Sequence, residues 1–332
     1  MTKSPANFVL SLAALALLAQ LQATPAAADL LTRVWVSNTG SDTGLPCGPI
    51  TAPCRTFRTA TFLVAAGGEV GVLNSGDYGS FDVTKSLSFT NDGAGEAAVT
   101  RLADDNRAIL INAGVGDIVS LRGLVIDGGV AGGIGIAIGQ VTAVHVQNCV
   151  IKNFEGGGNA SGIHVIAQNN VSLFVSDTII YNNGNFGQSG GILLFPEVTG
   201  SVNVVLDRVH LENNVFGLFV TGRFGTGNGA HVVIRDSVIA GNIRDGIQAI
   251  SGSPGFSPAF ILVERTSVVN NGGTGILADG PHATVLLKEN TISRNGAGIS
   301  AVNSGQLISY GNNTNTNNIG PEGAPTGLFT PM

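Results

Sequence analysis

The sequence predicts an all-β fold, a parallel β-helix whose coils each take about 27 residues. Two recurring phrases and an unusual composition support this prediction. The chain has 332 residues, of which 48 are glycine and only 11% are charged. Soluble domains usually contain about 25% charged residues, so this composition favours stacked, turn-dense β-structure over a helical bundle.

The first phrase has eight residues: a short apolar strand, a bend, a second short strand and a final asparagine or glycine. Its copies occupy residues 121–128, 146–153, 175–182, 206–213, 234–241, 263–270 and 288–295, and a degenerate copy ends at Asn318. The second phrase is a glycine followed by isoleucine or leucine, and it follows each copy in phase. No segment of the repeat keeps a 3.6-residue apolar period over the length of a helix.

A single unit of this repeat cannot bury its apolar positions, so the units must stack into a solenoid. Each strand then pairs in parallel with its copy in the next coil, which gives three parallel sheets around a core of Ile, Val and Leu. Identical amides stacked ~4.8 Å apart can hydrogen-bond to one another and satisfy buried turn groups. We therefore interpret the terminal asparagines as a structural ladder: Asn153, Asn182, Asn213, Asn270 and Asn295.

Charged residues alternate in sign along two columns of the repeat alignment. The second position of the phrase reads Gln147, Ser176, Asp207, Arg235, Glu264 and Glu289, and the third reads Asn148, Asp177, Arg208, Asp236, Arg265 and Asn290. An aspartate beside an arginine could be a proton-transfer pair, because the arginine lowers the carboxyl pKa. We favour the alternative that opposite charges on adjacent strands set the sheet register.

The motif Val-x-Asn/Asp-x-x-Ile-x-x-Asn followed by Gly-Ile resembles the right-handed parallel β-helix repeat proteins of the pectin-lyase-like superfamily. The resemblance covers roughly residues 50–320. It implies a single-stranded right-handed parallel β-helix with a short N-terminal capping helix. The segments Arg55–Ala60, Ala65–Gly68 and Ser75–Tyr78 also match the N-terminal part of such proteins.

A capping helix is predicted independently of that resemblance. Phe57, Ala60, Thr61 and Val64 fall at i, i+3, i+4 and i+7, and Gly67 is available to end the helix. The apolar face of such a helix would cover the open end of the core, which would otherwise expose a strand edge. We expect a tail at residues 321–332 to lie across the last coil at the other end.

The chain begins like an exported protein. Lys3 precedes an apolar run from Phe8 to Leu18, and the small residues Ala26 to Ala28 fit a signal-peptidase site. The run is shorter than the ~20 residues that span a bilayer. We therefore expect a signal peptide at residues 1–28, a secreted or periplasmic protein, and no transmembrane segment.

The predicted mature chain begins with residues 29–68, which hold a strand, a cysteine loop and the capping helix, and continues with the β-helix at 69–320. Cys47 and Cys54 bracket a short turn, and in an oxidising compartment such a pair favours a disulfide. A metal pair or two unlinked thiols are the alternatives. Cys149 lies within an apolar strand, where a cysteine usually acts as a small buried hydrophobe.

Charge and motif content limit the functional classes. The formal net charge is −6 and no basic cluster occurs, so a nucleic-acid partner is not expected. The five histidines do not share one repeat position, and we predict no metal site and no cofactor. The resemblance directs a search for polysaccharide hydrolase and lyase motifs, of which only the pair Asp104-Asp105 is present. We interpret that pair as a solvated turn.

The outer face of the glycine-led strand is the candidate binding surface. If the residue after the glycine points inward, the next residue and the one two positions further on point outward. Over successive coils they form an unusually apolar outer face. The candidate ligand-binding residues are His164, Leu193, Phe195, Phe219, Arg223 and Gln248. We favour the interpretation that the loops after this strand cover the column, because monomers seldom expose large apolar patches.

The scaffold without the catalytic motifs leads to one preferred function and two alternatives. We expect a secreted, non-catalytic β-helix that binds extracellular polysaccharide or another envelope or surface component. One alternative is a polysaccharide lyase or glycoside hydrolase acting on uronate-containing glycans, with His164, Arg223, Arg244 and Asp245 as candidate participants. The other is a structural or adhesive spacer.

Overall fold

The computed structural model describes residues 30–43, 46–101, 106–129, 132–252 and 255–329. The predicted signal peptide at 1–28 lies outside these residues. The described chain from Leu31 onward is one compact unit. No helix within it is long and apolar enough to cross a membrane.

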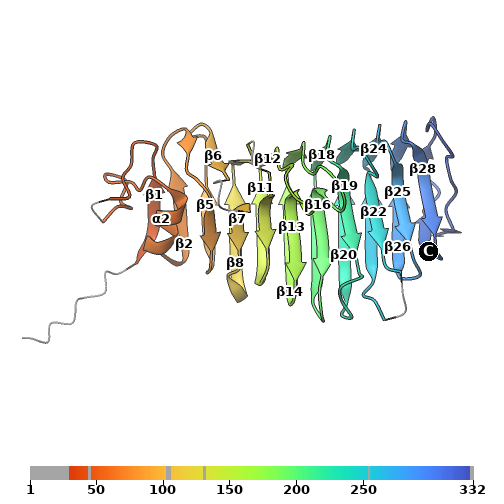
Figure 1. The fold of residues 1–332 in the computed structure, drawn as a ribbon, viewed down its shortest axis with the longest axis horizontal. Helices are drawn as coiled ribbons and strands as arrows, with labels where there is room; N and C mark the ends of the chain where they lie inside the picture. The colour runs from red at the N-terminus through yellow and green to blue at the C-terminus, as the bar shows by residue number, and fades with distance from the viewer. Residues whose placement is uncertain (1–29, 44–45, 102–105, 130–131, 253–254, 330–332) are drawn as a thin grey trace, which may run out of the picture. The chain divides into compact units, whose positions relative to one another are not determined.

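Three parallel sheets form this unit, and in each sheet the strands follow one another in chain order (Figure 1). Sheet A contains β1 (Leu31–Val36), β2 (Val64–Val72), β5 (Leu87–Thr90), β8 (Gly114–Arg122), β11 (Val141–Gln147), β14 (Asn170–Ser176), β17 (Ser201–Asp207), β20 (Gly229–Arg235), β23 (Ala259–Glu264), β26 (Ala283–Lys288), β29 (Gln306–Ser309) and β31 (Gly327–Leu328). The predicted all-β parallel solenoid is confirmed.

The two other sheets follow the same order. Sheet B contains β3 (Gly76–Asp77), β6 (Ala97–Thr100), β9 (Leu124–Asp127), β12 (Val150–Lys152), β15 (Ile179–Tyr181), β18 (His210–Glu212), β21 (Val238–Ala240), β24 (Ser267–Val269), β27 (Thr291–Ser293) and β30 (Thr314–Asn315). Sheet C contains β4 (Phe81–Val83), β7 (Arg107–Ile111), β10 (Ile134–Ile138), β13 (Ser161–Ala167), β16 (Gly190–Pro196), β19 (Phe216–Thr221), β22 (Ile247–Ile250), β25 (Thr274–Asp279) and β28 (Ala297–Val302).

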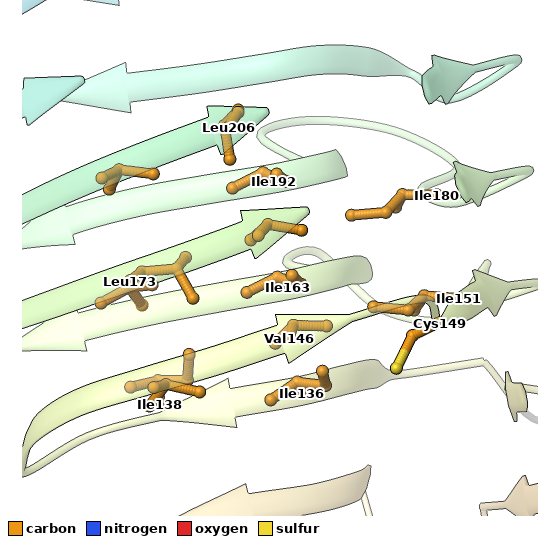
Figure 2. Close-up of a cluster of buried hydrophobic side chains, with 14 of the residues drawn as sticks. Ile136, Ile138, Val146, Cys149, Ile151, Ile163, Leu173, Ile180, Ile192 and Leu206 are labelled. Atoms are coloured by element: carbon orange, nitrogen blue, oxygen red, sulfur yellow. The ribbon is translucent and has the colours of Figure 1, made fainter. Parts of the chain in front are cut away.

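The core lies between the three sheets and consists of ladders of aliphatic side chains. Ile136, Ile163 and Ile192 occupy equivalent positions on successive strands of sheet C, and their side chains point inward (Figure 2). Ile151 pairs in the same way with Ile180 in sheet B. Cys149 is buried among them, and burial raises the pKa of its thiol to about 11. This thiol therefore acts as a small core residue.

The capping helix is α2 (Phe57–Leu63), and the side chain of Thr56 caps it by accepting the Thr59 N–H. Phe57 contacts Tyr78, Phe81 and Phe89 at ring distances of 5.1, 5.1 and 5.5 Å, which closes the end of the core. The helix ends at Leu63 and not at Gly67, because Val64 is already extended and begins β2.

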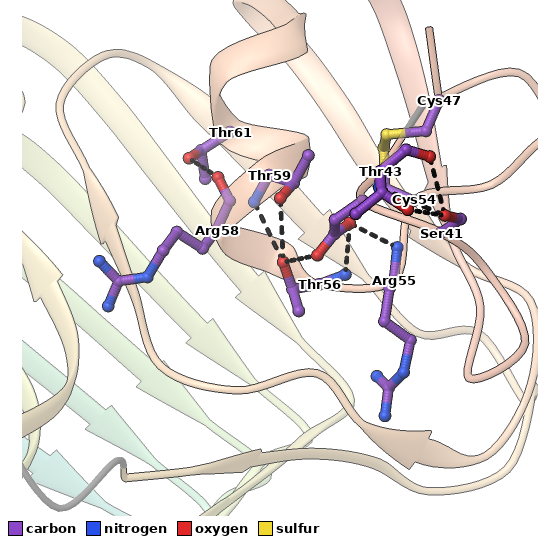
Figure 3. The surroundings of a disulfide bond; sticks show 10 residues. Ser41, Thr43, Cys47, Cys54, Arg55, Thr56, Arg58, Thr59 and Thr61 are labelled. Carbon is purple, nitrogen blue, oxygen red and sulfur yellow. Dashed lines mark hydrogen bonds between the residues drawn. A yellow bond between two sulfur atoms is a disulfide. The ribbon is translucent and has the colours of Figure 1, made fainter. Parts of the chain in front are cut away.

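The structure joins Cys47 and Cys54 in a disulfide (Figure 3). The loop that it closes lies along β1: the Trp35 N–H donates to the Gly48 carbonyl (2.8 Å), and the Cys54 N–H donates to the Trp35 carbonyl (2.9 Å). These bonds occupy the outer edge of β1, the first strand of sheet A. The loop therefore protects an edge that would otherwise be open to other strands.

Replacing both Cys47 and Cys54 by serine is expected to lower the free energy of unfolding by about 2 kcal/mol, because the short closed loop loses its covalent constraint. Thermal denaturation of the variant and the parent checks this result. The double variant should also show faster amide hydrogen exchange in β1 than the parent does, whereas exchange in the central coils should be the same in both proteins. Equal exchange in β1 of both proteins would show that the loop does not depend on the disulfide.

The asparagine ladder is one residue further along the chain than predicted. Asn182, Asn213 and Asn270 point outward and have positive φ of 57°, 53° and 58°. The residue after each turn points inward, and the ladder consists of Asn183, Asn214, Asn242, Asn271, Asn295 and Asn318. Of the predicted set, Asn295 belongs to this ladder. Asn153, Asn182, Asn213 and Asn270 form the adjacent outer column.

The physical reason is the turn itself. A residue in the left-handed region reverses the chain so that the next side chain enters the core, and asparagine tolerates that region. Inside, the amide groups are satisfied by the neighbouring coils: the Asn242 Nδ2 donates to Asn271 Oδ1 on the following coil (2.8 Å) and to the Leu211 carbonyl on the preceding coil (3.1 Å). In the outer column, Asn182 Nδ2 donates to Asn153 Oδ1 (2.8 Å).

The last copy of the phrase is also shifted by one residue, because Lys288 and not Glu289 pairs with Glu264. With this register the signs alternate strictly along Asp207, Arg235, Glu264 and Lys288, and along Asp177, Arg208, Asp236, Arg265 and Glu289. Ion pairs join neighbouring coils, among them Arg208 with Asp177 (2.7 Å) and Arg265 with Asp236 (2.8 Å). The arginines hold the pKa of Asp177 and Asp236 below the usual value.

The C-terminal tail forms a last, irregular coil. The Gly298 and Ile299 N–H groups donate to the carbonyls of Pro321 and Glu322 (2.9 Å each), and β31 pairs with β29. The Glu322 carboxylate accepts the Asn318 backbone N–H (3.2 Å) and the Asn318 side-chain amide. Its oxygens therefore satisfy the last amide of the ladder.

Candidate functional site

The predicted ligand-binding column on sheet C has the predicted register but is not an open surface. His164, Leu193, Phe219 and Gln248 pair in this order on β13, β16, β19 and β22. The side chains of His164, Leu193 and Phe219 are all buried. A ligand at this face would therefore contact the residues above them.

A second apolar cluster covers the column. It consists of Leu193, Phe195, Val215, Phe216, Phe219 and Ile250. The ring of Phe195 contacts those of His164 (4.8 Å), Phe219 (5.9 Å) and Phe224 (5.5 Å). Phe224 comes from the segment 222–228 that follows β19, so this loop folds back over the sheet, as the favoured interpretation of the sequence expected.

His164 is 1% exposed, and neither ring nitrogen has a hydrogen-bond partner among the described residues. Burial lowers the pKa of its imidazole to about 4, because the charged form would lose its hydration without gaining a partner. The ring is therefore neutral over most of the pH range. It is an apolar packing element at neutral pH.

The two remaining candidates reach solvent at the edge of this cluster. Arg223 is exposed and lies 4.0 Å from the Asp279 carboxylate. Gln248 is half-buried, and its Oε1 has no hydrogen-bond partner among the described residues. The six predicted residues thus lie on one face. Arg223 is the exposed one, Gln248 is half-buried, and the other four are buried.

The candidate catalytic residues contact other groups of the protein. The Arg244 guanidinium lies over the Phe216 ring at 5.6 Å. The Asp245 carboxylate accepts the Thr274 N–H (2.6 Å), and burial raises the pKa of this carboxyl. No hydrogen bond or ion pair within the described residues joins any two of His164, Arg223, Arg244 and Asp245. Asp104 and Asp105 lie outside the described residues.

The outer face of sheet A carries an open strip that the sequence analysis did not single out. Its members occupy one register position on seven successive strands: His145, Phe174, Val205, Val233, Leu262, Leu286 and Ile308. All seven are exposed or half-buried. We call this column the sheet A strip. The column of alternating charges that ends at Lys288 lies two residues further along the same strands.

An aromatic platform lies at the N-terminal end of the strip. The rings of His145 on β11 and Phe174 on β14 are stacked, with centroids 4.8 Å apart and planes inclined by 11°. Phe174 is 40% exposed. The adjacent column repeats the arrangement less closely, with His231 and Phe260 at 5.9 Å and 39°. Exposed rings that lie stacked on one another form an apolar patch, and such patches mark interaction sites when they are large.

A polar pocket of about 440 Å³ lies where the chain passes from sheet C to sheet A, at the start of the two strands that carry the platform. Its walls are formed by Val115, Thr142, Gln168, Asn169, Asn170 and Thr199. Thr142 shares β11 with His145, and Asn170 shares β14 with Phe174. Side-chain amides and hydroxyls therefore precede the stacked rings on the same two strands, by three residues on β11 and four on β14. We call this the amide pocket.

The register could have revealed the strip. The four residues before each copy of the phrase alternate between inward and outward positions, and every second one faces solvent. The predicted binding residues instead lie on the glycine-led strand, where the apolar content is higher.

One cluster of three potential metal ligands occurs within the described residues: Asp42, Cys47 and Cys54. The two sulfurs form the disulfide. The Asp42 carboxylate accepts the N–H groups of Arg55 (2.7 Å) and Thr56 (3.2 Å) ahead of α2. These contacts give the cluster a structural role at the N-terminal end.

The sequence and the structure are similar to known proteins. A family model described as "Right handed beta helix region" matches residues 224–323. The crystal structure of pectate lyase Pel9A is 15% identical, with a TM-score of 0.58 over 91% of this chain and 80% of that chain. The Dettilon tailspike protein is 12% identical, with a TM-score of 0.42 over 79% of this chain and 62% of that chain. No curated protein matches the sequence.

Proposed function

From the right-handed parallel β-helix of the pectin-lyase-like fold, we propose that this chain is a secreted, non-catalytic protein that binds extracellular polysaccharide on the outer face of sheet A. The observation that carries the proposal is the exposed His145–Phe174 stack, with the amide pocket at the start of the same two strands. Pectate lyase Pel9A, which shares the fold, is by its name an enzyme of polysaccharides.

The chemistry of this face suits a glycan. A sugar ring has an apolar face, which packs on an aromatic side chain, and hydroxyls, which need donors and acceptors. The platform offers the first, and Thr142, Gln168 and Asn170 offer the second. Because the strip continues over seven strands at a strand spacing of ~4.8 Å, a chain-like ligand would contact several coils at once.

The non-catalytic part of the proposal rests on the partners of the candidate catalytic groups. Arg223 pairs with Asp279, Arg244 lies on a phenylalanine ring, and Asp245 holds a backbone N–H. A general acid or base must instead reach the proton that it transfers. A lyase or hydrolase and a structural spacer remain the alternatives, and product analysis separates them.

Replacing Phe174 by alanine is expected to weaken glycan binding at least tenfold, because an aromatic contact contributes about 1.5 kcal/mol beyond its area. The mature protein would be tested for retention on immobilised uronate-containing and neutral glycans. Phe224→Ala is the matched control: this phenylalanine is 50% exposed, but it lies in the loop that covers sheet C.

The control should bind as the parent does, and both variants should keep the parent melting temperature. Equal binding by Phe174→Ala and the parent would refute the sheet A site. New unsaturated ends during incubation would identify a lyase, and new reducing ends would identify a hydrolase. Failure of the parent to bind any glycan would favour the spacer.

A further inference from the structure

One exposed residue per coil occupies the turn between sheet B and sheet C in the left-handed conformation. The column reads Asn153, Asn182, Asn213, Gly241, Asn270, Arg294 and Asn317, with φ between 53° and 66°. Asparagine and glycine adopt this conformation most readily, whereas other side chains are strained in it. Arg294, with φ of 58°, is the departure from the pattern.

Arg294 also differs from the arginines of the charge ladders. Arg208, Arg235 and Arg265 each contact a carboxylate on a neighbouring coil at 3.0 Å or less. The guanidinium of Arg294 makes no hydrogen bond or ion pair with any described residue. The nearest acidic side chain of the last coil, Glu322, has its carboxylate bound to Asn318. A ladder role therefore does not account for this arginine.

The neighbours of Arg294 in the column present two more donors. The Arg294 N–H donates to the Asn317 carbonyl (3.1 Å), and the Asn270 N–H donates to the Ser293 carbonyl (3.1 Å), so the three residues lie on successive coils. The side-chain amides of Asn270 and Asn317 have no partner among the described residues. One guanidinium thus stands between two available amides.

These residues line a hollow in the surface. A pocket of about 580 Å³ has Asn270, Arg294 and Asn317 in its walls, together with the ladder residues Asn271 and Asn318 and with Ile319. Ile319 is 86% exposed and supplies an apolar wall. The amides of Asn271 and Asn318 are bound within the ladder, so Asn270, Arg294 and Asn317 are the groups open to a ligand.

We propose that this corner is an oxyanion-binding site, in which Arg294 takes a carboxylate or sulfate group of a hydroxylated ligand. The planar guanidinium matches two oxygens of such a group, and the flanking amides donate to the same group or to adjacent hydroxyls. Ile319 packs against the apolar face of the ligand. The site lies at the turn between sheets B and C, and it does not depend on binding at sheet A.

Arg294→Asn is the decisive variant, because it restores the residue that the column uses elsewhere. Asparagine is favoured at positive φ, so the variant should fold as well as the parent or better. The probes are an oligogalacturonide, its methyl ester, and a sulfated galacto-oligosaccharide. Titrations would be followed by NMR of the Arg294 side-chain N–H and of the Asn270 and Asn317 amides.

In the parent, one or both charged probes should shift these signals, and the uncharged ester should not. A shift by the oligogalacturonide alone identifies carboxylate as the bound group, and a shift by the sulfated probe alone identifies sulfate. Arg294→Asn should weaken binding of the active probe at least tenfold. Arg294→Lys, which keeps the charge but not the planar fork, should retain part of the affinity.

Two controls separate this site from others. Arg107→Asn removes an exposed arginine far along the stack, on β7, and should leave the titration unchanged. Phe174→Ala removes the platform of sheet A and should also leave it unchanged. The proposal fails if no charged probe shifts the Arg294 signal, if the ester binds as well as the acid, or if Arg294→Asn binds as the parent does.

Discussion

Asn214→Ala is expected to lower the free energy of unfolding by about 3 kcal/mol, because several buried polar groups lose their partners at once. The Asn214 Oδ1 accepts both the backbone N–H (3.1 Å) and the side-chain amide (2.9 Å) of Asn183. Its Nδ2 donates to the Ile180 carbonyl (3.0 Å). All of these groups are buried, so water cannot replace the bonds.

Asn213→Ala is the matched control, since Asn213 precedes Asn214 and points to solvent with φ of 53°. The control should cost only about 1 kcal/mol, because alanine is less favourable than asparagine in the left-handed region but no buried hydrogen bond is lost. Urea denaturation of the two variants measures both values. If Asn213→Ala were the more damaging change, the outer column would be the structural ladder and the inner one would not.

His164→Leu is expected to remove an acid-dependent loss of stability. Burial lowers the pKa of His164 from 6.5 in the unfolded chain to about 4 in the folded protein. Between these values the unfolded chain binds the proton and the folded protein does not, so stability falls as pH falls through this window. The full difference corresponds to about 3 kcal/mol at pH 4 and below.

Leucine suits the position, because Leu193 occupies the same place on the next strand and the site already lacks polar partners. The free energy of unfolding would be measured for both proteins between pH 3.5 and 7.5. The difference between the two curves isolates His164 from the carboxylates, which also titrate in acid. Parallel curves would show that the imidazole finds a partner or leaves the cluster at no cost.

Much of the fold followed from the sequence because the repeat fixes the register. A one-residue slip would turn every inward side chain outward, so the pattern of Ile and Val at equivalent positions specifies the pairing. The predicted outer column from His164 through Phe219 to Gln248 has the order that the phrase spacing implied. The capping helix was also placed correctly, apart from its end at Leu63.

The ladder register was harder, because four of the turns contain two consecutive asparagines. In Asn182-Asn183 the first residue adopts positive φ and the second enters the core, and composition alone does not distinguish them. Arg294-Asn295 resolves the ambiguity once the last copy is aligned on Lys288, since an arginine would not occupy the inner place. The predicted ladder used the final residue of each phrase, which is the outer residue in four copies, and the late alignment of the last copy put Asn295 among them.

The candidate site was less accessible to sequence reasoning, because exposure depends on loops. The sheet C column held the candidate binding residues, although coverage by loops was the favoured interpretation, and Phe195 and Phe224 do close over it. The ring stack of His145 and Phe174 arises between residues 29 positions apart, and only the register brings them together. Nothing in the local sequence of either residue marks it.

The contact of Glu322 with Asn318 has a consequence for the length of the stack. Asn271 and Asn295 each donate a side-chain N–H to the amide oxygen of the following coil, and Asn295 also accepts from the preceding one, like a bifunctional monomer in a growing polymer. A carboxylate accepts at both oxygens but donates from neither, as a chain terminator does. The Glu322 side chain therefore offers no N–H that could donate to a further amide of the ladder.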